Sequence, residues 1–153
     1  MTEGTERRRS TRSGPLRYRY RGDMSEAENS HSEHSHSTRY GRDVQAELRE
    51  PGTALRRAIP GVYEGFKALS YAAFADGVLE RRTKELIALG IAVSTQCDGC
   101  IASHARGAAR SGATESEVAE MLGVCIQMMG GPGTVYAARA FTAFRDFASE
   151  VVN

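Results

Sequence analysis

Two cysteines and a histidine lie close together in the stretch STQCDGCIASHARGAARSG, residues 94–112. Cys97, Cys100 and His104 are separated by three and four positions, so on a helix they would lie near one face within two turns. Two thiols at this spacing can form a redox-active disulfide, supply two ligands of a zinc site, or have no function.

A dithiol redox cycle is the chemistry that this spacing favours most. Near the start of a helix, unpaired backbone N–H groups and the helix dipole stabilise a thiolate, the form that attacks a peroxide or a disulfide. A sulfenic acid on one cysteine can be trapped by the other as a disulfide. His104, one turn beyond Cys100, is placed to take or return a proton. Alone, His104 would more often be an ordinary surface histidine.

A zinc site is a weaker interpretation, because structural zinc needs four ligands. The sequence has no second CxxC pair, and the third cysteine, Cys125, stands among the apolar residues of a predicted helix. We interpret Cys125 as a buried core thiol. We therefore expect no metal ion at the cysteine pair.

The elements that must position these residues are all predicted to be helices, since no alternating strand pattern occurs from Arg42 onward. Residues 42–50 predict a short polar helix that Pro51 and Gly52 end. Residues 61–77 predict an amphipathic helix. Its apolar stripe consists of Val62, Phe66, Leu69 and Ala73.

Four further helical patterns follow. Residues 79–95 are apolar on nearly all sides, which is typical of a core or a subunit interface. The helix of the cysteine pair is predicted from about residue 98 to 110. Thr114 and Glu117 form a capping box at the start of the next helix, which two glycines end. The last helix covers residues 133–152. Its predicted inner face consists of Val135, Ala138, Phe141, Ala143 and Phe144.

The fold class that follows is all-α, with residues 42–153 as one helical domain. A lone bundle of about 110 residues has a marginal core, so we expect an oligomer to cover the remaining apolar side chains. These include Met121, Met128, Met129 and the aromatic face of the last helix.

Residues 1–41 are polar and predict a disordered tail. Three other interpretations are possible. The arginines and tyrosines could bind single-stranded nucleic acid, or the segment could be a degenerate transit peptide. Alternatively, the start codon was assigned too early and translation begins at Met24. We favour a solvated, functionally silent tail. His31, His34 and His36 could bind a metal loosely, but we expect none there because a mobile tract has no fixed geometry.

Charge and hydropathy exclude several partners. Residues 38–153 carry equal numbers of basic and acidic residues, which gives no electrostatic case for nucleic acid. No apolar run approaches the ~20 residues that cross a bilayer, and no signal peptide pattern follows Met1. An odd number of cysteines does not resemble a secreted disulfide framework. We expect a cytoplasmic protein without nucleic acid or membrane partners.

The stretches ERRTKELIALGIAVSTQCDGCIASHARGAARSGATESEVAEML and GGPGTVYAARAF resemble a known family. Over roughly residues 55–150 the chain is similar to the alkylhydroperoxidase D-like branch of the carboxymuconolactone decarboxylase superfamily. The family motif is a glutamate, eleven residues, CxxC, three residues and a histidine. Glu85, Cys97, Cys100 and His104 match it position for position.

The resemblance implies an all-helical fold, assembled as a homotrimer or homohexamer and working without metal, haem or flavin. This chain has one copy of the helical unit, so its oligomer can differ from that of family members with two units. It implies that Cys100 attacks a small-molecule hydroperoxide and that Cys97 resolves the sulfenic acid as a disulfide. A dithiol such as dihydrolipoamide, or a redox partner protein, would reduce that disulfide. Glu85 and His104 would form a proton relay.

Some alternatives stay open at this point. By helical rise alone Glu85 and His104 would not meet in a simple hairpin, so a crossing angle or a bend must bring them together. Otherwise Glu85 would be a surface partner of Arg81 or Arg82. Asp98, between the cysteines, would raise a neighbouring thiol pKa and slow a peroxidase. The rival functions are a decarboxylase-type lyase, which needs no CxxC, and a non-enzymatic redox sensor.

Overall fold

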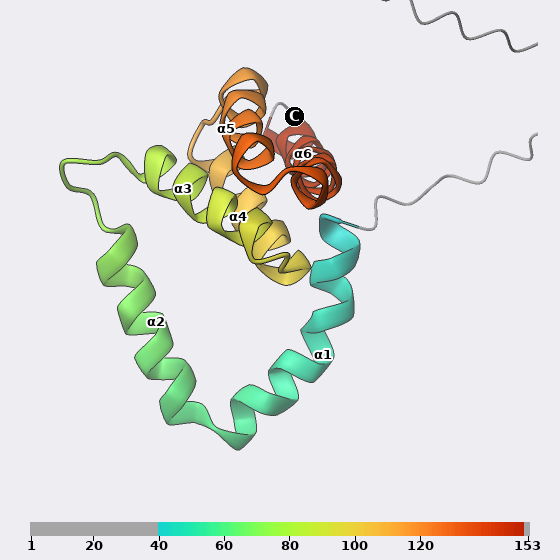
Figure 1. Cartoon of the computed structure of the whole chain (residues 1–153). Helices are drawn as coiled ribbons and strands as arrows, with labels where there is room; N and C mark the ends of the chain where they lie inside the picture. The colour runs from blue at the N-terminus through green and yellow to red at the C-terminus, as the bar shows by residue number, and fades with distance from the viewer. Residues whose placement is uncertain (1–39, 152–153) are drawn as a thin grey trace, which may run out of the picture. The chain divides into compact units, whose positions relative to one another are not determined.

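The computed structural model describes residues 40–151, which form six helices and, within that range, no strand (Figure 1). The helices are α1 (Arg42–Ala58), α2 (Pro60–Phe74), α3 (Arg81–Ser94), α4 (Asp98–Arg110), α5 (Glu115–Met129) and α6 (Gly131–Val151). The predicted all-α class is confirmed. Most of the predicted tail, with its three histidines, lies outside the described residues.

Helices α3 to α6 form the core, and α4 packs against both α3 and α6. The buried face of α4 is made almost entirely of small residues. They are Ala102, Ala105, Ala108 and Ala109, with Ile101 as the one large buried side chain. Because alanine projects only a methyl group, the neighbouring helices approach α4 closely. The start of α4, which carries the cysteines, is thereby fixed on a packed helix.

The predicted boundaries of α4 and α5 are confirmed. Gly112 has φ +77° after the end of α4, a conformation that favours glycine. The Thr114 side chain accepts a hydrogen bond from the backbone N–H of Glu117, and the Glu117 carboxylate accepts one from the backbone N–H of Thr114. This is the predicted capping box. Gly130, with φ +65°, ends α5.

Part of the predicted inner face of α6 is wrong. Val135 is half exposed and Ala138 is exposed, whereas Ala143 and Phe144 are buried as predicted. Gly133 sets the orientation of the helix, because a Cβ there would lie 3.0 Å from the Ile126 Cα on α5. Helical spacing from this close contact puts four residues inward. They are Ala137, Ala140, Phe144 and Phe147.

The prediction that Pro51 and Gly52 end the first helix is also wrong, because α1 continues through both to Ala58. Proline removes one backbone donor and thereby leaves the carbonyl of Glu47 without its helical partner. Glu47 and Pro51 are exposed, so water can donate to that carbonyl and the helix survives. No residue of α1 is buried.

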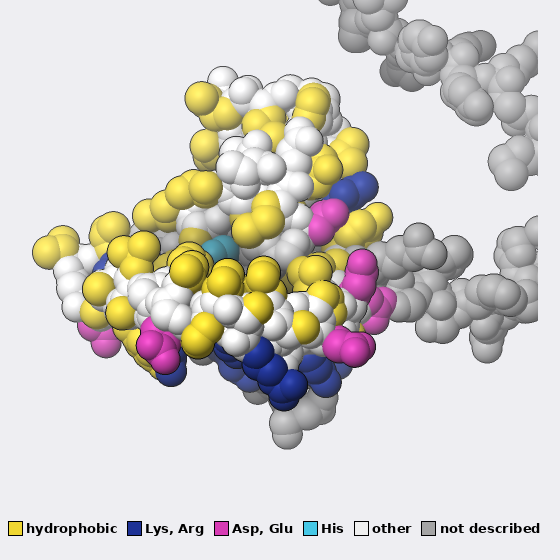
Figure 2. All heavy atoms as spheres, turned by 90° about the horizontal axis from the view of Figure 1, so that it is seen from below, with side chains coloured by type: hydrophobic (Ala, Val, Ile, Leu, Met, Phe, Trp, Pro, Cys, Tyr) yellow, Lys and Arg dark blue, Asp and Glu magenta, His cyan; other side chains and the backbone are white. Residues whose placement is uncertain are grey.

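Helix α2 begins with Pro60 in its first turn and ends at Phe74, three residues before the predicted stop at Gly77. Its apolar stripe is present but largely uncovered: Val62, Phe66 and Leu69 are each about two-thirds exposed. Figure 2 shows hydrophobic side chains gathered along the α1–α2 hairpin. Among the described residues, no helix has the length and apolarity that crossing a membrane requires.

Candidate active site

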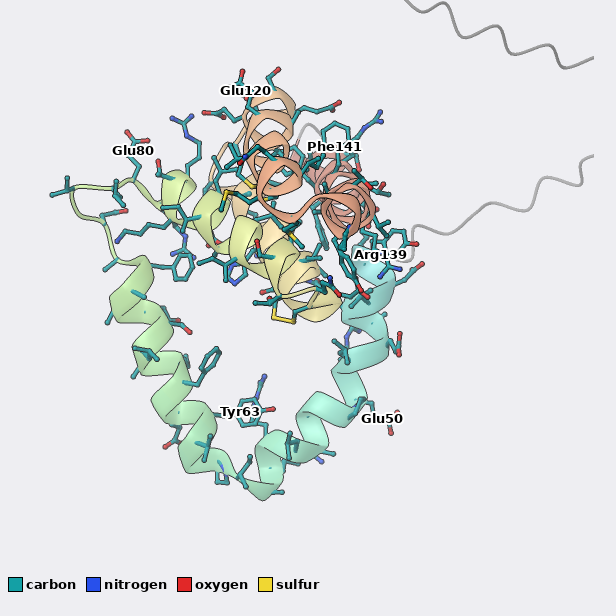
Figure 3. All side chains as sticks on the ribbon, viewed as in Figure 1. Glu50, Tyr63, Glu80, Glu120, Arg139 and Phe141 are labelled. Carbon is teal, nitrogen blue, oxygen red and sulfur yellow. A yellow bond between two sulfur atoms is a disulfide. The ribbon has the colours of Figure 1, made fainter. Side chains whose placement is uncertain are left out.

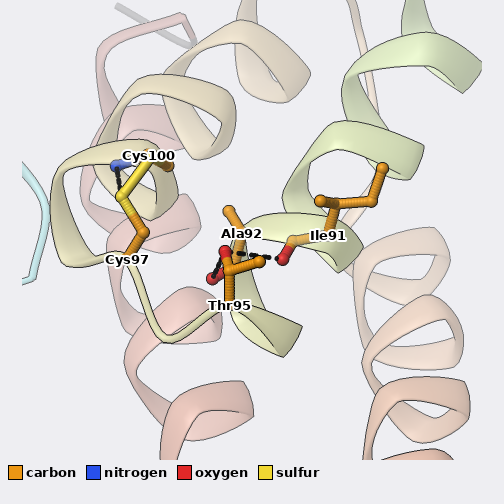
Figure 4. The surroundings of a disulfide bond; sticks show 5 residues. All are labelled: Ile91, Ala92, Thr95, Cys97 and Cys100. Atoms are coloured by element: carbon orange, nitrogen blue, oxygen red, sulfur yellow. Dashed lines mark hydrogen bonds between the residues drawn. A yellow bond between two sulfur atoms is a disulfide. The ribbon is translucent and has the colours of Figure 1, made fainter.

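The two predicted site cysteines meet at the start of α4. Cys97 is the N-cap residue, and its Sγ accepts a hydrogen bond of 3.2 Å from the backbone N–H of Cys100 (Figure 4). The sulfurs form a disulfide, with the two Cα atoms 5.2 Å apart. Cys100 is exposed and Cys97 is half-buried. A peptide N–H directed at Sγ stabilises negative charge on that sulfur when the disulfide is reduced.

The turn before Cys97 joins α3 to α4 in a few residues. Gln96 has φ +56°, in the left-handed region, and Thr95 closes α3. The Thr95 hydroxyl donates to the carbonyl oxygens of Ile91 and Ala92, at 3.0 and 3.3 Å. The tight turn places the cysteines directly after a core helix.

The second pair of predicted site residues, Glu85 and His104, is also brought together. His104 Nδ1 lies 3.0 Å from Glu85 Oε2, so an ionised Glu85 accepts a hydrogen bond from the ring. In a neutral imidazole, this arrangement corresponds to the tautomer with the proton on Nδ1 and with Nε2 as the acceptor nitrogen. Phe74 stacks on the imidazole with the ring centroids 5.7 Å apart.

Gly107 explains why a glutamate on α3 reaches a histidine on α4. A Cβ at Gly107 would collide with the Glu85 carboxylate, so the missing side chain leaves the space that the carboxylate occupies. The Glu85 side chain extends past Gly107 to His104, one turn earlier. An estimate from helical rise alone does not take account of the space that Gly107 leaves for the Glu85 side chain.

The surface interpretation of Glu85 is half right. Arg81 does pair with it, Nη2 to Oε1 at 3.3 Å, four residues apart on α3. Glu85 is nevertheless only 4% exposed, and the other carboxylate oxygen binds His104. A buried carboxylate held by a cation and an imidazole is an arrangement suited to moving a proton.

Asp98, between the cysteines, has a partner that the sequence did not reveal. Arg139 on α6 donates from Nη1 to both carboxylate oxygens, at 3.3 and 3.2 Å. The guanidinium also lies over two aromatic rings, 5.1 Å from the Tyr40 centroid and 4.6 Å from that of Tyr136. Figure 3 labels Arg139, close to the N-terminal end of α1. Burial alone would lower the pKa of Arg139, but the Asp98 carboxylate outweighs it and raises the pKa. The sequence-based expectation treats Asp98 as a free charge, whereas in the structure Asp98 is paired with Arg139.

The first half of α1 lies over the start of α4, which sequence reasoning also missed. A Cβ at Gly99, between the cysteines, would lie 3.0 Å from the Leu48 Cδ1. The Gln45 amide donates to the Ala102 carbonyl at 3.3 Å and accepts from Arg106 Nη1 at 3.3 Å. The glycine between the two cysteines was the available signal, since it indicates close approach of another element.

A cavity of about 910 Å³ opens beside His104 and Glu85. Its apolar part consists of Phe66, Tyr71 and Phe74. Its basic residues are Lys67, Arg81, Arg82, Arg106 and Arg110, against Glu80 and Glu85. Neither cysteine is among its lining residues, and the described residues contain no hydrogen bond between His104 and either sulfur. The cysteine pair and His104 therefore lie on the same helix, α4, without a hydrogen bond between them, and Glu85 reaches His104 from α3.

The third cysteine is a buried core thiol, as predicted. Cys125 Sγ lies 3.7 Å from Met121 Sδ, and burial raises the pKa of the thiol. A raised pKa makes this thiol a poor nucleophile. Among residues 40–151, no group of three or more His, Cys, Asp or Glu is arranged to hold a metal ion.

Comparison with known proteins assigns the family. A model described as "Carboxymuconolactone decarboxylase family" matches residues 60–143, more than half of the chain. The chain belongs to the carboxymuconolactone decarboxylase family. The matched range begins with α2 and contains Glu85, Cys97, Cys100 and His104.

The chain is also similar to individual proteins. An uncharacterized protein of Cupriavidus necator is 40% identical over 98 residues, covering 64% of this chain and 87% of the relative. The "uncharacterized protein 4 in cox locus" of Paracoccus denitrificans is 43% identical over 84 residues, which cover 55% of this chain and 76% of the relative. The apo crystal structure of a carboxymuconolactone decarboxylase family protein from Legionella pneumophila matches with a TM-score of 0.69 and 38% identity. That match covers 73% of this chain and 99% of the other.

Proposed function

We propose that this member of the family is a cofactor-free dithiol oxidoreductase of the alkylhydroperoxidase D-like branch, located in the cytoplasm. It reduces organic hydroperoxides, or the disulfide of a partner protein, through Cys97 and Cys100. The observation that carries the proposal is the disulfide-forming pair at the N-terminus of α4, one turn from a histidine bound to a buried carboxylate.

In the proposed cycle, the Cys100 thiolate attacks the terminal peroxide oxygen, the O–O bond breaks, and the alkoxide takes a proton and leaves as an alcohol. Cys97 then attacks the sulfenic sulfur of Cys100, and water leaves as the disulfide forms. Two electrons pass from the two thiols to the peroxide. A dithiol such as dihydrolipoamide returns two electrons and two protons and becomes a disulfide itself.

The assignment of roles to the cysteines is supported by their surroundings. Cys100 is exposed and can meet a substrate, whereas Cys97 is half-buried and accepts a backbone hydrogen bond. That hydrogen bond favours Cys97 as a leaving thiolate when the disulfide is reduced.

We propose that Glu85 and His104 relay protons to and from this dithiol. Residues Cys100 and His104 are one turn apart on α4, with about 5–6 Å between Cβ atoms at this spacing. A bound substrate or a water molecule has to bridge that gap, because Nδ1 is occupied by Glu85.

A carboxymuconolactone decarboxylase-type lyase is the second candidate, and the cavity is the observation that favours it. The cavity contains Glu85 and His104 but neither cysteine, and three of its basic residues have no acidic partner among the described residues. These three are Lys67, Arg106 and Arg110. They would suit a substrate that bears a carboxylate.

Mass spectrometry separates the two candidates. One equivalent of an alkyl hydroperoxide should remove two hydrogens from the reduced Cys97–Cys100 peptide, and dihydrolipoamide should restore them. An activity on a lactone that survives loss of both cysteines would establish the lyase instead. A disulfide that changes only the oligomeric state, without turnover, would indicate a redox sensor.

Single substitutions test the role of each cysteine. Cys100→Ser should abolish peroxide consumption, and Cys97→Ser should leave a trappable sulfenic acid on Cys100. Full turnover of Cys97→Ser with dihydrolipoamide would contradict the resolving role.

A further inference from the structure

The residue between the cysteines that most affects their charge is Asp98, directly after Cys97 and in the first turn of α4. A free carboxylate there opposes ionisation of both thiols. A reactive dithiol gains from the opposite environment, one that stabilises the thiolate. The backbone N–H of Cys100, directed at the Cys97 sulfur, provides part of it but does not remove the aspartate charge.

Arg139 supplies the missing countercharge from another helix. Its Nη1 donates to both oxygens of Asp98, and its guanidinium contacts the rings of Tyr40 and Tyr136. The pair is not deeply buried, with 29% of the Arg139 side chain and 40% of the Asp98 side chain exposed. An ion pair of that exposure adds little to folding stability. Asp98 nevertheless directly follows Cys97 and is two residues from Cys100, so its charge state bears on the ionisation of both thiols.

The contacts recorded for the Asp98–Arg139 pair involve Tyr136 on α6 and Tyr40 before α1. Further along α4, His104 binds Glu85 of α3, and Arg106 binds Gln45 of α1. Helix α1 contributes the apolar Leu48 over Gly99. Glu85 is already paired with Arg81 and His104. Arg139 is therefore the cation that balances Asp98.

We infer that Arg139 is a positioning residue for the dithiol: by neutralising Asp98 it keeps Cys97 and Cys100 reactive. The inference rests on the proposed dithiol function. The Arg139–Asp98 pair acts on the thiols through charge and needs no contact with the substrate. Removing Arg139 should therefore affect the thiols only while Asp98 is present.

The test measures thiol ionisation without any peroxide. The protein is reduced, the reductant is removed, and the rate of iodoacetamide alkylation at Cys97 and Cys100 is followed by peptide mass across a pH series. In Arg139→Gln, the pH at which the alkylation rate reaches half its maximum should move upward. At pH values below that midpoint, alkylation should be about threefold slower, which corresponds to half a pKa unit. Asp98→Asn in the same chain should restore the wild-type profile, and Arg139→Lys should largely keep it.

Arg145→Gln is the matched control. Arg145 is also on α6 and also lies near an aromatic ring, 5.9 Å from the Phe141 centroid, but its ion pair of 3.6 Å is with Glu115. Its profile should equal that of the wild type. An unchanged midpoint in Arg139→Gln would overturn the inference, as would a shift that persists after Asp98→Asn is added.

A folding failure of Arg139→Gln would leave the single variant Asp98→Asn as the deciding measurement. Its midpoint should move downward, because Arg139 is then an unbalanced cation, and no movement would overturn the inference. Alkylation reports on the thiols even when peroxide turnover is absent. Failure of the inference and failure of the proposed peroxidase function are therefore distinguishable.

Discussion

At the scale of single residues, the site depends on the absence of a side chain at Gly107 as much as on the polar side chains around it. Gly107 leaves the space in which the Glu85 carboxylate lies, and that carboxylate binds His104. Motif spacing locates the glutamate and the histidine, but it contains no information on the glycine that lets them meet. The glycine is visible only once α3 and α4 are packed.

The two helical glycines Gly107 and Gly123 should therefore respond to alanine in opposite ways. Gly107→Ala drives a methyl group into the Glu85 carboxylate, which should cost about 1–3 kcal/mol and lower turnover by displacing Glu85 from His104. Gly123 is exposed on α5, and a methyl group added there would meet nothing within 4 Å. Gly123→Ala should therefore stabilise the protein by about 0.5–1 kcal/mol.

Chemical denaturation and peroxide consumption, measured on both variants, check this pair. If Gly107→Ala and Gly123→Ala changed the free energy of unfolding by the same amount and in the same direction, the backbone at Gly107 would be able to shift without displacing the Glu85 carboxylate. Unchanged turnover in Gly107→Ala would argue against Glu85 as part of the relay.

At the scale of helices, the ends are fixed by local chemistry. Accepting hydrogen bonds from the backbone N–H and the hydroxyl of Thr114 lowers the pKa of Glu117, with Arg82 contributing. A carboxyl whose folded pKa lies below its unfolded pKa stabilises the fold above the unfolded value, and this stabilisation is lost as pH falls through the folded value.

Glu117→Gln should consequently lower Tm at neutral pH, where the charge is present, and the deficit should disappear in acid. Thermal unfolding at neutral pH and again below the titration range of carboxyl groups measures it. Glu120→Gln on the same helix is the control and should change Tm little at either pH. If the Tm of Glu117→Gln stayed below that of the wild type in acid, the loss would come from altered cap geometry and not from the missing charge.

Sequence patterns predict the helices with strong end signals and miss the features that depend on packing. Gly112 and the Thr114 capping box predict the end of α4 and the start of α5 because those signals are local. Pro51 is also a local signal, but exposure of α1 overrides it. Arg139 is 41 residues from Asp98, so the ion pair at the cysteines cannot be read from spacing.

At the scale of the molecule, the described chain leaves large apolar side chains uncovered on several helices. The α2 stripe is one such face. Another is the outer face of α3, where Ile87 is 50% and Ile91 59% exposed although Leu89 and Val93 on the same helix are buried. A monomer that keeps these faces in water loses the free energy that their burial would provide. We therefore propose that the chain assembles as a homotrimer or homohexamer in which α2 contacts another copy.

A charge placed in the α2 stripe should break that assembly. Leu69 is 66% exposed in the chain, so Leu69→Asp costs little in the folded monomer but would bury an unpaired charge in an interface. Light scattering coupled to size exclusion should give three or six times the chain mass for the wild type and a smaller species for Leu69→Asp. Glu64→Gln, on the same helix but outside the stripe, should keep the wild-type mass. A monomeric wild type at micromolar concentration would contradict the proposal and would leave the exposed face of α2 for a different protein.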